Sequence, residues 1–413
     1  MNASRPVVTV VGIGADGWPG VPERLRRIVV AAEVLLGGER HLALVPPVDA
    51  QVRTPWPRPL RAGLPDLLAA HAGRRVVALA SGDPLVSGIG TTLVDLLGAD
   101  AVRVEPAVSS VALAHARLGW ATESTVVVSA VARDVRRVLR ELAPGRRVVV
   151  LSSDASTPAD LAALLTMGGW GPSRMTVLGD LGAAEESRLE GEAYDWCDDA
   201  PAFSALNVVA VEARAEGVDG FVTWASGLPD EAFENDGPLT KRDLRASALA
   251  RLAPSPGELL WDVGAGAGSV GIEWMRAHPT CRTIAIEDVP SRAAAVRRNA
   301  GRLGVPDLRV VQGRAPGALA GLPTPDAVFL GGGATVPGVL EACLGALRPG
   351  GRLVVHGVTV ETEALLAERH GALGGELTRH SVETAARLGS FRGFTPARAV
   401  TQWAWDKTQK ESS

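Results

Sequence analysis

The sequence predicts an α/β protein with mostly parallel sheets. Short apolar runs alternate along the chain with helical stretches rich in alanine, leucine and arginine, a pattern typical of strand–helix–strand units. Two of the apolar runs end in glycine-rich turns, at residues 12–17 and 264–268. A chain of 413 residues is too long for one ordinary core, so we expect two or three domains.

The predicted strands recur at regular intervals. In the first half they cover residues 7–13, 75–80, 124–129, 147–152, 175–178 and 206–211. In the second half they cover residues 259–263, 283–286, 308–311, 327–330 and 352–356. A helix is expected over 269–277, directly after the second glycine-rich turn.

One stretch rich in glycine and acidic residues breaks this rhythm, and we interpret it as a linker. The predicted organisation is therefore an N-terminal domain, a linker and a C-terminal domain, at residues 1–214, 215–236 and 237–406. The N-terminal domain divides near Glu105 into lobes 1–105 and 106–214. The polar tail, 407–413, is expected to fray.

A helix is predicted to begin the C-terminal domain. Thr240 and Asp243 form a capping-box pattern at its start. Its expected buried face follows helical spacing and comprises Leu244, Ala248, Leu249 and Leu252.

Composition argues against several classes of protein. The net charge of −4 gives no electrostatic basis for a nucleic-acid partner. The three cysteines form no Cys-x-x-Cys pair, so we expect neither a zinc site nor a disulfide framework. No apolar run has the ~18 residues that a membrane-spanning helix needs, and the N-terminus shows no signal-peptide pattern. We expect a soluble, cytoplasmic protein without metal.

The turn after the strand at 259–263 predicts a cofactor site. Asp262 precedes Gly264, Gly266 and Gly268, and Glu287 ends the next apolar run. Glycines let the backbone approach a ligand, and the following helix offers unpaired N–H groups. A carboxylate at the end of the next strand can accept both hydroxyls of a ribose. These residues therefore predict a nucleotide-like cofactor.

Two cofactors compete for this turn. Gly266, Gly268 and Gly271 match the dinucleotide fingerprint, which would make the protein a nicotinamide-dependent oxidoreductase. S-adenosylmethionine is favoured because the glycines follow an acid-ending strand and a leading helix precedes that strand. The strand after Glu287 also leads into Gly313 and Ala315, where adenine would lie.

The acceptor of the methyl group is expected to be large and flat. Residues 329–335 carry three consecutive glycines and lack the Asp/Asn-Pro-Pro-aromatic loop of enzymes that methylate exocyclic base nitrogens. Cys343 lies in a helical run without a Pro-Cys motif, so a cysteine nucleophile is not expected.

The N-terminal half carries a second set of strand-end motifs. Gly12 and Gly14 form a turn after the first strand, and Gly82 and Asp83 form a Gly-Asp-Pro turn after another. The serine pair 109–110 then opens a helix, where it can cap the N-terminus or face a cleft. These glycines, the aspartate and both serines, Ser109 and Ser110, are the predicted N-terminal cofactor residues.

These motifs resemble those of a known family. Gly12–Gly14, Gly37–Leu42, Ser81–Pro84, Glu105–Ser110 and Phe203–Val209 resemble the tetrapyrrole methylases, and more narrowly the precorrin C5-methylating branch of cobalamin synthesis. The C-terminal half, with residues 237–241, 262–268 and 329–335, is similar to the decarboxylating C15-methylating partner. Two positions depart from the pattern: the pair 15–16 replaces a frequent Pro-Gly, and Arg314 replaces a common acid.

The resemblance implies both a fold and an activity. The fold would be an N-terminal two-lobed tetrapyrrole methylase domain followed by a C-terminal Rossmann-like class I methyltransferase domain. Two S-adenosylmethionine sites would serve C5 and C15 methylation of a precorrin, with loss of one acetate as carbon dioxide, and Thr240 would join the second site. Apart from the resemblance, we expect a homo-oligomer. A non-enzymatic tetrapyrrole carrier remains an alternative.

A precorrin bears many carboxylates, so an acidic protein needs local cations to bind it. Two clusters are predicted to do so: Lys241, Arg242 and Arg245 on the leading helix, and Arg387, Arg392 and Arg398 in the last segment. No catalytic residue is assigned from the sequence.

Overall fold

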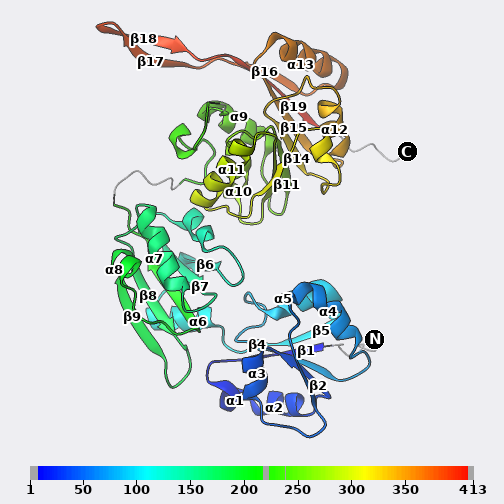
Figure 1. Ribbon diagram of the computed structural model, residues 1–413, viewed down its shortest axis with the longest axis vertical. Helices are drawn as coiled ribbons and strands as arrows, with labels where there is room; N and C mark the ends of the chain where they lie inside the picture. Colours follow the sequence, from blue (N-terminus) through cyan, green and yellow to red (C-terminus); the bar gives the residue numbers. More distant parts are fainter. Residues whose placement is uncertain (1–7, 217–222, 238, 408–413) are drawn as a thin grey trace. The chain divides into compact units, whose positions relative to one another are not determined.

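The computed structural model describes residues 8–216, 223–237 and 239–407, and it has the expected α/β class (Figure 1). The expected tail beyond residue 407 lies outside them. Contacts divide the chain into an N-terminal unit, residues 1–135 and 142–218, and a C-terminal unit, residues 136–141 and 219–413. Across the described residues, no helix combines the length and apolarity needed to cross a membrane.

Five parallel strands form the first sheet of the N-terminal unit, in the order β3-β2-β4-β1-β5. The strands are β1 Val8–Ile13, β2 Val34–Gly37, β3 Val52–Pro55, β4 Val76–Ser81 and β5 Val102–Glu105. The helices are α1 Gly17–Gly20, α2 Glu23–Val30, α3 Glu39–Leu44, α4 Leu60–Ala69 and α5 Ile89–Leu97. Val10 packs in one core cluster and Val11 in another, so the sheet is buried on both faces. This explains the continuous apolar runs.

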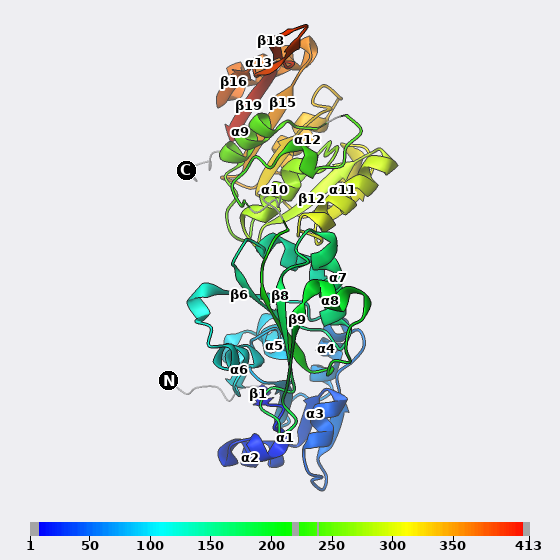
Figure 2. The ribbon, with the colours of Figure 1, turned by 90° about the vertical axis from the view of Figure 1, so that its left-hand side faces the viewer.

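The second sheet of this unit is mixed, which corrects the expectation of mostly parallel strands. Its order is β6-β7-β10-β8-β9; β6 and β7 are parallel and the other pairs antiparallel. The strands are β6 Thr125–Ser129, β7 Arg147–Leu151, β8 Arg174–Gly179, β9 Ser187–Glu192 and β10 Asn207–Glu212. The helices are α6 Ser110–Leu118, α7 Thr157–Met167 and α8 Ala193–Asp198 (Figure 2). Strand β9 was not predicted because it is almost entirely exposed and lacks apolar alternation.

The C-terminal unit contains a seven-stranded sheet in the order β13-β12-β11-β14-β15-β19-β16. The first five strands are parallel, and β19 is antiparallel to both neighbours. The strands are β11 Leu259–Val263, β12 Arg282–Glu287, β13 Arg309–Gln312, β14 Ala327–Leu330, β15 Arg352–Gly357, β16 Glu376–His380 and β19 Val400–Asp406. The helices are α9 Arg242–Leu252, α10 Ser269–Ala277, α11 Pro290–Arg302, α12 Val339–Ala346 and α13 Val360–Leu373.

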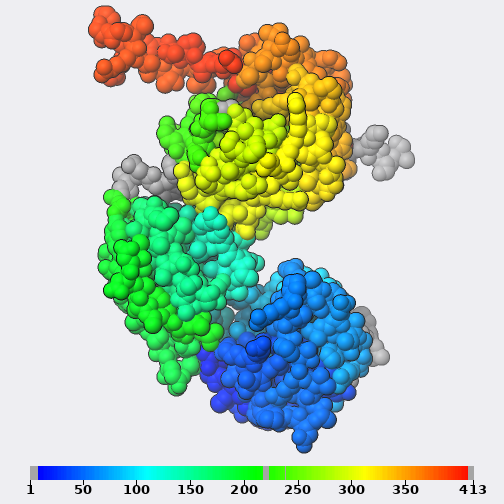
Figure 3. Space-filling view, in the orientation of Figure 1, coloured from blue at the N-terminus to red at the C-terminus, as the bar shows by residue number. Residues whose placement is uncertain are grey.

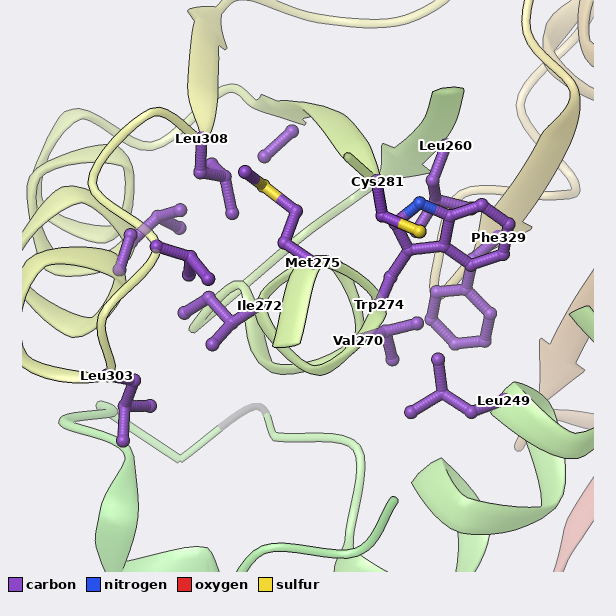
Figure 4. Close-up of a cluster of buried hydrophobic side chains, with 14 of the residues drawn as sticks. Leu249, Leu260, Val270, Ile272, Trp274, Met275, Cys281, Leu303, Leu308 and Phe329 are labelled. Atoms are coloured by element: carbon purple, nitrogen blue, oxygen red, sulfur yellow. The ribbon is translucent and has the colours of Figure 1, made fainter. Parts of the chain in front are cut away.

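Helix α10 follows the glycine-rich turn and is buried at nearly every position. Val270, Ile272 and Trp274 belong to one core cluster with Leu260 of β11 and Phe329 of β14 (Figure 4). The helix therefore cannot shift without disrupting the core, and the turn at its N-terminus is held in place.

Part of the expected linker belongs to the core of the C-terminal unit. Leu228 and Phe233 are buried there, whereas residues 217–222 lie outside the described residues. Glu273 of α10 holds this segment, because its carboxylate accepts the backbone N–H of Gly227 at 2.6 Å and of Leu228 at 2.9 Å. The linker-like composition of this segment did not indicate that it is held in place, because the residue that holds it, Glu273, lies far away in the sequence.

Helix α9 differs from its prediction at the N-terminus. Lys241 is the N-cap and no side chain caps the helix, so the predicted capping box is wrong. Arg245, not Leu244, begins the buried face. The arginine is buried because its Nε donates to Glu273 at 2.5 Å and its guanidinium lies 4.7 Å from the centre of the Phe233 ring.

Replacing Glu273 by alanine is expected to destabilise the C-terminal unit by about 3–5 kcal/mol, because it removes the nearer of the two carboxylates paired with the buried Arg245 guanidinium and leaves only Asp230, at 3.4 Å. Denaturant unfolding, followed by circular dichroism, measures the change. Arg298 is the matched control: it forms an exposed ion pair with Glu234, and its alanine variant should cost no more than about 1 kcal/mol. Equal midpoints for the two variants would contradict the expectation.

A two-stranded sheet, β17 Glu383–Leu388 and β18 Phe391–Pro396, projects from the C-terminal unit as a hairpin (Figure 3). Arg387 and Arg392 are directly opposite one another in its register. Leu388, Phe391 and Phe394 are 71%, 77% and 73% exposed. The sequence did not predict these strands, because every position but one is exposed and no buried face imposes alternation.

Candidate functional site

The N-terminal unit contains a cavity of about 400 Å³ between its two lobes. It lies at the carboxyl ends of β1 and β4 and at the start of α6, the edge of a parallel sheet where ligands usually bind. Of the predicted residues, the lining includes Gly14, Gly82, Asp83, Ser109 and Ser110.

Gly12 is a structural requirement of this edge. A Cβ at Gly12 would lie 2.0 Å from the Gly82 carbonyl oxygen and 2.6 Å from the Ala107 nitrogen. Those two groups are themselves hydrogen-bonded at 3.1 Å, and the Gly82 N–H donates to the Ile13 carbonyl at 2.8 Å. Gly12 thus lets three loops meet at the rim of the cavity, but it is not among the described residues that line it.

Two of the predicted polar side chains at the cavity already accept hydrogen bonds from backbone N–H groups. Asp83 Oδ1 accepts the Leu85 N–H at 2.9 Å, and Ser109 Oγ caps α6 by accepting the Ala112 N–H at 3.1 Å. Both interactions fix the loops, and Ser110 begins the helix itself.

The motifs at residues 37–42 and 81–84 were named from the sequence, but no role in the cavity was predicted for their polar residues Arg40, His41 and Ser81. Arg40, His41 and Ser81 line it, and Asp180 lines it from the second lobe. His41 Nε2 lies 3.0 Å from Ser81 Oγ and 3.2 Å from Arg40 Nη2. Burial, followed by the Arg40 charge, lowers the pKa of His41 to about 4. The available signal was their position after a fully buried strand, at the edge where β1 and β4 also end.

The second candidate site is the turn between β11 and α10. Gly264, Gly266 and Gly268 have φ angles of +69°, +57° and +75°, a region that side chains disfavour. A Cβ at Gly264 would lie 3.3 Å from the Gly332 carbonyl oxygen, in the loop that follows β14. The glycines thus form a bare backbone cradle, such as a nucleotide-like ligand can approach closely.

The two predicted acids have different positions. Asp262 is 1% exposed and its Oδ2 accepts the Gly271 N–H at 2.9 Å. Burial, assisted by Glu287 and opposed by that hydrogen bond, raises the pKa of Asp262 to about 7. Asp262 lies beneath the turn and fixes the start of α10, and its contact with the cofactor stays a prediction.

Glu287 lies at the turn itself. Its Oε2 accepts the Gly266 N–H at 2.8 Å and its Oε1 accepts the Val289 N–H at 3.0 Å. Gly313 donates its N–H to the Glu287 carbonyl at 3.0 Å, which brings the ends of β12 and β13 together.

A smaller cavity, about 150 Å³, adjoins the turn. Gly266 and Ala267 line it together with residues from 234–236 and α11. Thr240 and Ala315 are both partly buried and are not among its lining residues in the part of the chain that the structure describes.

The predicted substrate cations are absent from the described linings of both cavities. For Arg245 the prediction is wrong, since the side chain is 0% exposed and bound to Glu273, Asp230 and backbone carbonyls. Lys241 is exposed and pairs with Asp230 at 3.4 Å. Arg242, Arg387, Arg392 and Arg398 are exposed. Among the described residues, none of the six lines either cavity.

Comparisons with known proteins match both halves of the chain. A model of tetrapyrrole (corrin/porphyrin) methylases matches residues 7–196, and a model of a precorrin methyltransferase domain matches residues 231–407. A Sinorhizobium sp protein named precorrin-6Y C(5,15)-methyltransferase [decarboxylating] is 45% identical over 97% of each chain. A solved C-terminal domain of the precorrin-6Y C5,15-methyltransferase from Rhodobacter capsulatus is 43% identical, covering 45% of this chain and 99% of that one, with a TM-score of 0.43.

Two shorter relatives from Salmonella typhimurium each match 44% of this chain. One is named cobalt-precorrin-6B C(15)-methyltransferase (decarboxylating), 33% identical with 97% of its length covered. The other is named cobalt-precorrin-7 C(5)-methyltransferase, 34% identical with 89% covered.

Proposed function

This chain belongs to the family of decarboxylating precorrin-6Y C5,15-methyltransferases, and on that premise we propose that it methylates a precorrin at C5 and C15 and removes one acetate as carbon dioxide, in cobalamin biosynthesis. Two observations together carry the proposal. The chain has two different glycine-rich backbone turns, one at the strand ends of each unit. An enzyme of this kind matches the chain along nearly its whole length. The existence of separate C5 and C15 relatives supports one reaction per half.

S-adenosylmethionine is the methyl donor of this family, and we propose one site in each unit. When bound, it supplies a methyl group that is already activated, so positioning carries most of the rate. In the N-terminal unit Gly14, Gly82, Asp83 and the two serines would hold it. In the C-terminal unit the residues would be Gly264, Gly266, Gly268, Glu287, Gly313, Ala315 and Thr240. Glycine cradles that a Cβ would obstruct fit such a ligand.

The C-terminal reaction requires little acid–base chemistry from the protein. Methylation of a meso carbon replaces C–H by C–C and releases one proton. Loss of an acetate carboxylate leaves its electron pair in the conjugated ring, and the remaining CH2 takes up one proton to become CH3. The proton released by methylation therefore balances the proton taken up after decarboxylation. Buried His356, whose Nε2 donates to Gln402 at 2.8 Å, has its pKa lowered to about 4 by burial and stays neutral.

The remaining exposed cations, Lys241, Arg242, Arg387, Arg392 and Arg398, are proposed to bind precorrin carboxylates. Arg387 and Arg392 support this, because two like charges directly opposite in a hairpin are unfavourable without an anion. We propose a cytoplasmic location and no nucleic-acid partner.

Mass spectrometry of a precorrin-6-type macrocycle, incubated with the protein and S-adenosylmethionine, tests the function. Gain of two methyl groups with loss of carbon dioxide is expected. A carrier would leave the mass unchanged, and an oxidoreductase would change it by hydrogen alone, with NAD(P)H in place of the donor. Either result would reject the proposal.

We also propose that the protein is a homo-oligomer and that the β17–β18 hairpin contacts a second copy. Isolated hairpins are marginal in water, and three large apolar side chains are exposed on this one.

Substituting serine for both Phe391 and Phe394 is expected to lower the molar mass measured by light scattering to that of a monomer. The control is Val360→Ser, on α13, where the side chain is 78% exposed and should not alter assembly. A monomeric wild type would reject the proposal outright.

A further inference from the structure

Arg40 is a cation without a carboxylate partner in the N-terminal cavity. It lies in α3, immediately after the buried strand β2, and it lines the cavity. Across the described residues, no carboxylate forms an ion pair with it within 4.0 Å. Asp180 lines the same cavity from the other lobe and attracts it without pairing, while burial lowers the pKa of Arg40. The remaining ionisable groups of the lining are His41 and Asp83.

The neighbours of Arg40 hold its guanidinium without neutralising it. A guanidinium can only donate, so His41 Nε2, 3.2 Å from Arg40 Nη2, must be the acceptor. The imidazole is then neutral and carries its proton on Nδ1. Ser81 Oγ, 3.0 Å away, can donate to the same nitrogen. His41 and Ser81 therefore position a full positive charge at the cavity wall without adding a second one.

The other acid on the same lobe does not compensate this charge. Asp83 uses its Oδ1 for the Leu85 N–H at 2.9 Å. The Arg40 side chain is exposed and lines the cavity, so a ligand carboxylate there can accept short, charge-assisted and partly bidentate hydrogen bonds from its guanidinium.

We propose that Arg40 binds a carboxylate of the ligand in the N-terminal cavity and that His41 is its positioning residue. The inference rests on the proposed function, which supplies two carriers of that carboxylate: an acetate or propionate of the precorrin, or the amino-acid end of the methyl donor. The exposed cations of the C-terminal unit play no part in it.

Two variants of Arg40 test the assignment. Arg40→Gln removes the charge, and Arg40→Lys keeps the charge but loses the planar fork. Charged hydrogen bonds contribute about 1.5–3 kcal/mol, so the glutamine variant should lose about 10- to 100-fold in affinity, and the lysine variant less. Binding of S-adenosylhomocysteine is measured by calorimetry, and binding of the precorrin by its absorbance change without donor.

The two binding measurements, one with S-adenosylhomocysteine and one with the precorrin, identify which ligand supplies the carboxylate. If the carboxylate belongs to the precorrin, KM of C5 methylation for the macrocycle rises while the affinity for the donor is unchanged. If the carboxylate belongs to the donor, the affinity for the donor falls while KM for the macrocycle is unchanged. C15 methylation by the same molecule is the internal control. Wild-type affinities for both ligands in Arg40→Gln would overturn the inference. A wild type that transfers no methyl group would reject the proposed function instead.

His41→Phe tests the positioning role. It removes the acceptor but leaves Arg40 in place, so we expect a smaller loss of affinity than in Arg40→Gln, with kcat of C5 methylation nearly unchanged. No added loss in the double variant is expected, because His41 acts through Arg40. Additive losses would contradict this role.

Discussion

Gly12→Ala is expected to abolish ligand binding in the N-terminal cavity and to leave the C-terminal site intact. The new Cβ would lie 2.0 Å from one backbone atom and 2.6 Å from another, and neither can move unless the loops after β1, β4 and β5 separate. Calorimetry with S-adenosylhomocysteine should show the stoichiometry falling from two to one. C5 methylation should vanish from the product mass.

Gly371→Ala is the control for this substitution. Gly371 lies in α13 and a Cβ there meets nothing within 4 Å, so alanine should be harmless or slightly stabilising. A Gly12→Ala protein that still binds two donors would show that the cavity is not a donor site or that the rim adjusts.

Glu287→Ala is expected to weaken donor binding in the C-terminal unit by on the order of a hundredfold or more. The carboxylate lies at the turn, against the Gly266 and Val289 N–H groups, where a ribose diol could donate two charge-assisted hydrogen bonds of about 1.5–3 kcal/mol each. The stoichiometry should again fall from two to one, with C15 methylation and decarboxylation lost together.

Glu287→Gln separates charge from shape. The amide oxygen can still accept the Gly266 N–H, so the turn should persist while affinity falls by a smaller factor. Combining Gly12→Ala with Glu287→Ala should leave no donor binding. If Glu287→Ala instead weakened both sites equally, the assignment of one donor site to each unit would fail.

Strands buried on both faces were the easiest elements to predict. The observed bounds of β11, β14 and α10 coincide with the predicted ones, because an apolar run, a glycine turn and a helix start are signals that neighbouring residues carry. β2 was not predicted although it is as short and as buried as β14, and β9, β17 and β18 are exposed. Their pairing depends on partners rather than on a pattern, so they were missed.

In the two sites, too, some features follow from the local sequence and others depend on residues far away in the chain. The positive φ angles of Gly264, Gly266 and Gly268 and the location of Glu287 at a strand end follow from local sequence, and the family's motifs identified the donor before any coordinates. The dinucleotide alternative used the same glycines, so spacing alone did not decide between them.

The roles of individual charges depended on contacts across the fold. Arg245 was predicted to be a surface cation on a helix, but it is buried and paired with Glu273. Asp262 was predicted from its place before the glycines, and only the fold shows that its carboxylate accepts the Gly271 N–H. Arg40 belongs to the motif at residues 37–42, but only the folded lobes place it in a cavity without a carboxylate partner. Local sequence specifies backbone geometry, whereas the energy of a charge is set by burial and by partners that can lie anywhere in the chain.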